Sequence, residues 1–199
     1  MEKFSLERAL SLESKYDDSL RTRPISPWLS KFVFYFSVIF AIYHYVTAGI
    51  GVPVDYWHMG AHISGVLILI FISFPAFKSS YDGDSPRKGI FSPLGVPFYD
   101  WALMIMGIAA SLYVGVTWYG FEINFFGFTY FIPEQVLRMG VPLPVDVVFG
   151  TLLIIVLLEA VRRTIGIIVP TIILIFIGYA VLGPHIPIQI LRHPGLSWS

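Results

Sequence analysis

The chain has 199 residues, of which 56% are hydrophobic, 17% aromatic and only 13% charged. Soluble domains carry about 25% charged residues, so this composition excludes an ordinary soluble domain and indicates a polytopic membrane protein. Basic and acidic side chains number 13 each, which leaves no net positive charge to attract nucleic acid. The absence of cysteine excludes disulfides, thiolate metal sites and cysteine nucleophiles.

The first 28 residues are predicted to form a cytoplasmic amphipathic segment, followed by a membrane domain at 29–199. Within residues 5–20, apolar side chains recur near one helical face and charged side chains lie opposite. This pattern is typical of a short helix on a membrane surface or on a partner. No small-residue cleavage site follows the first apolar run, so we expect no removable signal peptide.

After the N-terminal segment, the sequence contains apolar runs that are long enough to cross a bilayer. A spanning helix needs about 20 apolar residues. The last apolar stretch is too long for one span and contains Glu159, Arg162 and Arg163, each of which would cost about 2.5–3.5 kcal/mol in mid-bilayer. We therefore predict two helices that meet at a polar turn there. The expected fold is all-α, a membrane bundle of five spans (a four-span core plus a connecting-type helix) at 32–54, 56–77, 101–121, 144–161 and 165–183.

The distribution of basic residues predicts the orientation. Eleven of the 13 Lys and Arg residues lie in segments 1–31, 78–97 and 162–163, and only Arg138 and Arg192 lie in the alternate segments. Because basic residues concentrate on the cytoplasmic side, the N-terminus is predicted to be cytoplasmic. The aromatic-rich segment 121–144 would then lie at the outer interface, as an aromatic belt or a helix lying flat.

Residues near the ends of the predicted spans are expected to have interfacial or structural roles. Asp100 suits the N-terminus of the third helix. Glu159 precedes Arg162 and Arg163 by three and four residues, the spacing of an intrahelical ion pair. The full set is Trp28, Lys31, Trp57, Lys78, Asp100, Trp101, Arg138, Asp146, Glu159, Arg162 and Arg163.

Small residues on two spans are expected to serve helix packing, within the chain or against a partner. Lipid is as apolar as Leu, so membrane helices associate through close contact at small side chains. The residues expected to pack in this way are Gly60, Ser64 and Gly65 on the second span, and Gly107, Ala110, Ser111 and Gly115 on the third.

Three histidines are the main candidates for chemistry. His58 and His62 are spaced i, i+4, which could support metal binding, and His44 with either of them could ligate haem. Interfacial histidines more often bond backbone or water. The sequence contains no phosphate loop, nucleophile elbow or metalloprotease helix. We therefore expect no catalytic residue, metal ligand or substrate-binding residue in this chain, and no enzyme activity.

One sequence motif near the C-terminus points to a particular protein family. It reads Leu158-Glu159-Ala160-x-Arg162-Arg163-x-x-Gly166-x-x-x-Pro170. Matching residues precede and follow it: Arg138, Gly140, Pro142, Asp146, Gly150, Tyr179 and Gly183, with His62, Pro75 and Asp100-Trp101 upstream. Over most of residues 57–195 the chain resembles the small membrane subunit, or the small-subunit portion of a fused permease, of tripartite ATP-independent periplasmic (TRAP) transporters of the TAXI-type branch.

The resemblance implies a static scaffold subunit in the bacterial inner membrane. A large TRAP membrane subunit would hold the substrate and Na⁺ sites, and a periplasmic TAXI-type solute-binding protein would deliver organic acids or related carboxylates for sodium-driven symport. Membrane lipid is a further expected partner and nucleic acid is not. The fifth span would resemble the helix that joins the two parts of fused permeases. Two alternatives remain open at this point: a haem-binding membrane anchor of a redox complex, and a stand-alone channel or transporter.

Overall fold

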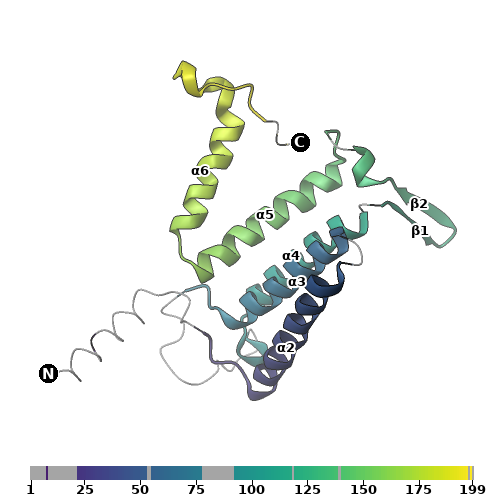
Figure 1. Cartoon of the computed structure of the whole chain (residues 1–199), viewed down its shortest axis with the longest axis vertical. Helices are drawn as coiled ribbons and strands as arrows, with labels where there is room; N and C mark the ends of the chain where they lie inside the picture. The colour runs from purple at the N-terminus through teal and green to yellow at the C-terminus, as the bar shows by residue number, and fades with distance from the viewer. Residues whose placement is uncertain are drawn as a thin grey trace.

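The computed structural model describes residues 8, 22–52, 55–77, 92–117, 119–138, 140–196 and 198. Apart from Arg8, the amphipathic segment predicted at residues 5–20 lies outside these residues, and so does Lys78. The described part of the chain forms five long helices and one β-hairpin (Figure 1).

The five helices are α2 (Pro27–Ile50), α3 (Asp55–Ser73), α4 (Phe98–Thr117), α5 (Pro144–Thr164) and α6 (Ile168–Leu182). Each is long and apolar enough to cross a membrane, counting with α6 the 3₁₀ turn that continues it to His185. The five apolar helices fit a transmembrane protein. The predicted count of five is confirmed for the described residues, whereas the crossing of a bilayer and the cytoplasmic N-terminus remain predictions.

All five helices differ from the predicted spans at one end or both, by up to five residues, and α2 and α5 are examples. α2 begins at Pro27 because the Ser26 hydroxyl accepts a hydrogen bond from the Leu29 amide at 3.4 Å, and proline suits the first helical position. α2 ends at Ile50, because the φ of +103° at Gly51 breaks the helix. α5 continues to Thr164, so Arg162 and Arg163 lie inside its last turn; the prediction that they form an interhelical turn is wrong.

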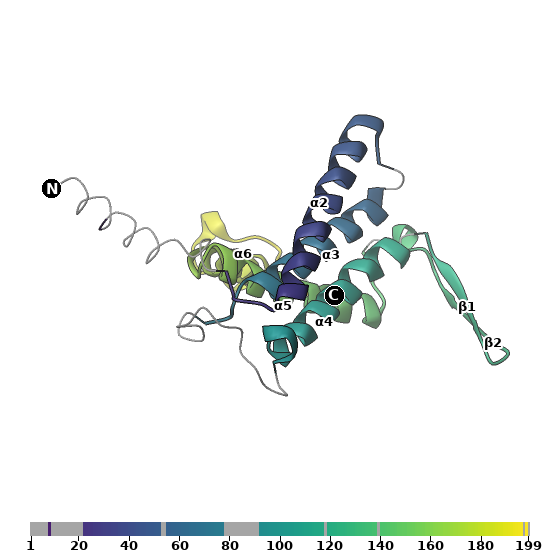
Figure 2. The ribbon, with the colours of Figure 1, turned by 90° about the horizontal axis from the view of Figure 1, so that it is seen from below.

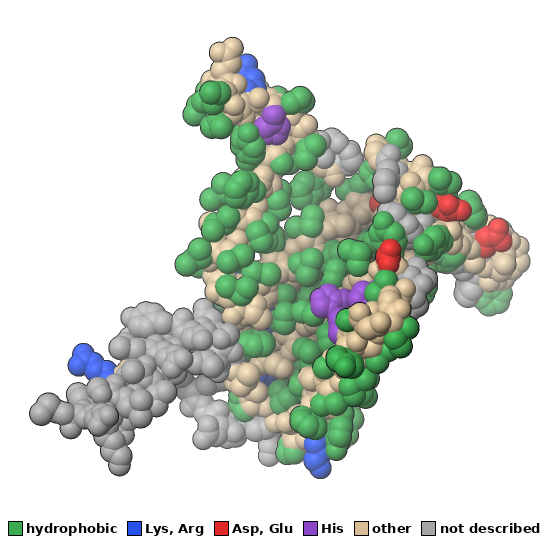
Figure 3. All heavy atoms as spheres, viewed as in Figure 1, with side chains coloured by type: hydrophobic (Ala, Val, Ile, Leu, Met, Phe, Trp, Pro, Cys, Tyr) green, Lys and Arg blue, Asp and Glu red, His purple; other side chains and the backbone are tan. Residues whose placement is uncertain are grey.

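The core lies between α3, α4 and α5. Phe71, Leu67 and Ile72 of α3 pack with Met104 of α4 and with Val156 of α5. By contrast, only 6% of the most apolar stretch of α2 and 11% of that of α6 is buried. Figure 1 shows α6 on the far side of α5 from the other helices, and hydrophobic side chains cover much of the visible face in Figure 3. The two outer helices therefore present most of their apolar surface outward.

The aromatic segment after α4 forms an antiparallel β-hairpin, so the flat helix considered for it is wrong and the fold is mostly rather than wholly α-helical. β1 (Phe121–Phe125) pairs with β2 (Phe128–Ile132), and the pair Phe125 and Phe128 closes a two-residue turn. Aromatic residues favour strands, and Gly127 takes a positive φ at the second position of the tight turn. Figure 2 shows the hairpin standing away from the helices.

Candidate functional site

A buried ion cluster joins one end of the bundle. The Asp100 carboxylate, in the first turn of α4, is completely buried and forms ion pairs with Arg23 and Arg163. Arg163 Nη1 lies 2.6 Å from Asp100 Oδ1. Both guanidinium groups also donate to the Phe74 carbonyl oxygen, at 3.2 and 3.3 Å. The cluster thus ties the segment before α2, the residues after α3, the start of α4 and the end of α5.

Glu159 extends this cluster along α5. Arg162 donates two hydrogen bonds to the Glu159 carboxylate, at 2.7 and 2.8 Å, and Arg163 Nε donates a third at 2.7 Å. Arg162 also donates to the Ala76 carbonyl oxygen at 2.9 Å. The i, i+3 and i, i+4 pairs expected from the sequence are therefore present. The contacts of Asp100 with arginines 63 and 77 residues away have no local sequence signal, and the sequence analysis missed them.

A second polar cluster lies at the other end of α4 and α5. Asp146 accepts hydrogen bonds from the Tyr113 hydroxyl at 2.6 Å and from the Leu143 amide at 2.7 Å, and it pairs with Arg138. Arg138 also donates to the Pro133 carbonyl oxygen at 3.1 and 3.2 Å. The cluster fixes the chain between the hairpin and α5 against α4. Both predicted residues take part, and Tyr113 is an addition that the sequence analysis did not identify.

The three candidate histidines come together between α2 and α3. His44 Nε2 lies 2.7 Å from His62 Nδ1, and the Tyr43 hydroxyl lies 2.7 Å from His58 Nδ1. Figure 3 shows a group of histidine side chains near the middle of the view, apart from the histidine side chain near its top. Two nitrogens bound to one metal from opposite sides would lie about 4 Å apart, twice the metal–nitrogen bond. The hydrogen-bonded rings therefore do not fit axial ligation of a haem iron, and among the described residues no group of three His, Asp or Glu is arranged for a metal ion.

The predicted small residues bring α3 and α4 into close contact. A Cβ at Gly60 would lie 2.9 Å from the Ser111 carbonyl oxygen, and one at Gly115 would lie 3.1 Å from the Tyr56 carbonyl oxygen. Ser64 and Ser111 share a buried hydrogen bond of 2.7 Å. Three other small residues lie in tight surroundings: Gly107 against α3 and α5, Ala110 fully buried, and Gly65 against the Phe40 ring. These positions serve packing within the chain.

The predicted interfacial residues lie near helix ends. Trp28 and Lys31 are exposed on the first turns of α2, and Trp57 is exposed at the start of α3. Trp101 is half-buried at the start of α4, where with Trp28 it lines an apolar cavity of about 270 Å³ between α2, α3 and α4. Their contact with a lipid interface stays a prediction.

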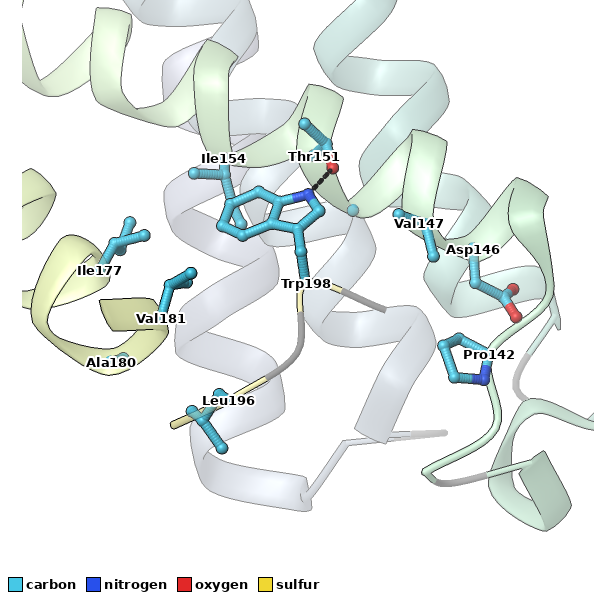
Figure 4. Close-up of a pocket in the computed structure, with 11 residues that line it drawn as sticks. Pro142, Asp146, Val147, Thr151, Ile154, Ile177, Ala180, Val181, Leu196 and Trp198 are labelled. Atoms are coloured by element: carbon cyan, nitrogen blue, oxygen red, sulfur yellow. Dashed lines mark hydrogen bonds between the residues drawn. The ribbon is translucent and has the colours of Figure 1, made fainter. Parts of the chain in front are cut away.

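A larger apolar groove of about 390 Å³ lies between α5 and α6 (Figure 4). Ile154 of α5 and Ile177 and Val181 of α6 line its two walls. Trp198 from the C-terminal segment reaches into it, and its indole N–H donates to the Thr151 hydroxyl at 2.9 Å. The groove has the chemistry of a surface for another apolar segment, with few polar groups to orient a small solute.

Comparisons with known proteins found no match to this chain among family models, curated proteins or solved structures.

Proposed function

We propose that this chain is the small, non-transporting scaffold subunit of a TRAP-type transporter of the TAXI branch, or the corresponding portion of a fused permease. In this proposal it braces a large membrane subunit in the bacterial inner membrane. That subunit carries out sodium-driven uptake of organic acids delivered by a periplasmic binding protein. The proposal rests on the sequence resemblance. It also rests on the ion pairs that the charged residues of the motif at 158–170 form within the chain.

The location of the charged residues is the observation that carries the proposal. Within the five helices, charged residues occur only in the first or last two turns. Glu159, Arg162 and Arg163 of the motif are held in ion pairs inside the chain. Ionisable residues on an ion or solute pathway typically face a cavity near the middle of the membrane. The arrangement supports a structural role for these charges.

The exposed apolar surfaces of the two outer helices are evidence for a partner in the membrane. α2 and α6 bury little of their apolar surface, and mostly apolar side chains line the groove between α5 and α6. Small residues and close apolar contacts are what membrane helices use to associate. Gly150 and Gly178 have no atom within 4 Å of where a Cβ would lie, so they leave room for a neighbouring helix on α5 and α6.

Photo-cross-linking followed by mass spectrometry tests the proposal. The chain has no cysteine, so a Phe176→Cys variant on the exposed face of α6 can carry a benzophenone label at one place. In native membranes we expect cross-links to one large polytopic protein, which also co-purifies in mild detergent. The same label at Val156→Cys, which is fully buried in the chain, is the control and should give only internal cross-links.

Two results would contradict the proposal. Cross-links from position 176 to lipid alone, with the chain purifying by itself, would exclude a stable membrane partner. A coloured preparation whose absorbance changes on reduction would favour the haem-anchor alternative, which the histidine geometry does not support.

A further inference from the structure

The turn of the β-hairpin holds an aromatic residue in an unfavourable conformation. Phe126 has a φ of +48° and Gly127 a φ of +81°. Two positive φ values define the tight hairpin turn that favours asparagine or aspartate followed by glycine. A bulky side chain is rarely found with positive φ. The Phe126 side chain is also 88% exposed.

The register of the hairpin separates two faces. Successive residues of a strand point to opposite faces, and directly paired residues share one. One face therefore carries Phe121, Phe128 and Ile132, and the other carries Glu122 and the hydrogen-bonded pair Asn124 and Thr129, together with Phe131. Phe128 is 81% exposed. The hairpin thus has an apolar face that remains uncovered near the turn.

The position of the hairpin favours a lipid surface as the covering partner. It begins four residues after the end of α4, and the segment that follows it is held to the start of α5 by the ion pair of Arg138 and Asp146. If α4 and α5 cross a bilayer, the hairpin leaves them where they reach its surface. Figures 1 and 2 both show that it turns aside from the line of α4. A strand of five residues, about 17 Å long, would then extend along the surface.

We propose that the β1–β2 hairpin is a membrane-surface anchor, with Phe126 and Phe128 inserted at the boundary between lipid headgroups and acyl chains. Aromatic side chains are favoured at this depth of the bilayer. Thr129, on the opposite face, stays in contact with water. The inference requires that α4 and α5 cross a bilayer, but it does not depend on the proposed TRAP partner.

Spin labelling of the full chain tests the anchor directly. Because the chain has no cysteine, Phe128→Cys and Thr129→Cys each introduce one labelling site on adjacent residues of opposite faces. The labelled chains are reconstituted into phosphatidylcholine–phosphatidylglycerol vesicles. Collisions of the spin label with two probes are then measured. Oxygen concentrates in the bilayer, whereas a nickel chelate stays in the water. We expect a several-fold higher oxygen-to-nickel collision ratio at position 128 than at position 129.

Three outcomes would overturn the proposal. Equal ratios with high nickel access at both positions would place the hairpin in water. Low access of both probes to position 128 would show that protein covers this face. In a third variant, Phe126→Asn is added to the Phe128→Cys chain, because asparagine suits the turn and removes only the aromatic ring. We expect a lower oxygen-to-nickel ratio in that variant than in the Phe128→Cys chain. An unchanged ratio would exclude Phe126 as part of the anchor.

Discussion

Asp100 shows how this chain tolerates a charge in an apolar surrounding. A buried carboxylate is destabilising unless it is paired and hydrogen-bonded. Here Arg23 and Arg163 meet its two oxygens from different segments, and both guanidinium groups also reach the Phe74 carbonyl oxygen. The three charges stabilise the fold only as a group, because removal of any member leaves another one buried without its partner.

Asp100→Asn should therefore destabilise the protein strongly. Loss of one partner from a buried pair typically lowers the free energy of unfolding by about 3–5 kcal/mol. Arg162→Gln is the control, because its pair with Glu159 is partly exposed (side chains 29% and 24%) and should contribute about 0–1 kcal/mol. Unfolding of the chain by titration with SDS in mild detergent measures both. Equal losses in the two variants would contradict the assigned role of the cluster.

The Tyr113 hydroxyl gives a second test at this scale. Tyr113→Phe removes one hydrogen bond of 2.6 Å to the Asp146 carboxylate and keeps the ring. Hydrogen bonds to charged groups contribute about 1.5–3 kcal/mol. Tyr179→Phe is the matched control, because its hydroxyl donates to the carbonyl oxygen of Leu191 at an exposed site. We expect a clear decrease in the midpoint of thermal unfolding for the first variant, and a change near zero for the second.

At the scale of elements, small residues bring the backbones of α3 and α4 into close contact. Gly60→Ala would bring a Cβ to 2.9 Å from the backbone oxygen of Ser111, and a backbone atom cannot move aside as a side chain can. Overpacking of this kind typically lowers the free energy of unfolding by about 1–3 kcal/mol.

Gly178→Ala on α6 is the control for Gly60→Ala. A Cβ there meets nothing within 4 Å in this chain, and alanine favours a helix over glycine by about 1 kcal/mol. In the isolated chain this variant should unfold at the same or a higher SDS concentration, whereas Gly60→Ala should unfold earlier. The role of the α3–α4 contact would be refuted if both variants behaved alike.

The sequence predicts these elements unequally. Five apolar runs are visible because a helix that crosses a bilayer needs a long uncharged stretch. The hairpin was missed because the aromatic density of residues 121–131 was interpreted as an interfacial belt, and because Phe126-Gly127 lacks the Asn or Asp that usually marks a two-residue hairpin turn. The partners of Asp100 could not be predicted, since only the packing of α4 against α5 brings Arg163 to it.

For the whole molecule, the order of the elements fixes which segments share a side of the membrane. If all five helices cross, the residues before α2, those between α3 and α4, and the turn after α5 lie on one side. The hairpin and the segment after α6 lie on the other. The buried ion cluster then belongs to the first side and the Asp146 cluster to the second.

Single-cysteine labelling tests this topology in full. Eleven of the 13 basic residues lie in the predicted cytoplasmic segments, so Thr22→Cys and Ser92→Cys should react with a membrane-impermeant maleimide only in inverted membrane vesicles. Thr129→Cys and Gln189→Cys should react only in right-side-out vesicles. Reaction of positions 22 and 189 from the same side would show that the number of crossings is even. Because α6 is the shortest of the five helices and one of the least buried, it would then be the helix that lies against the membrane surface or a partner.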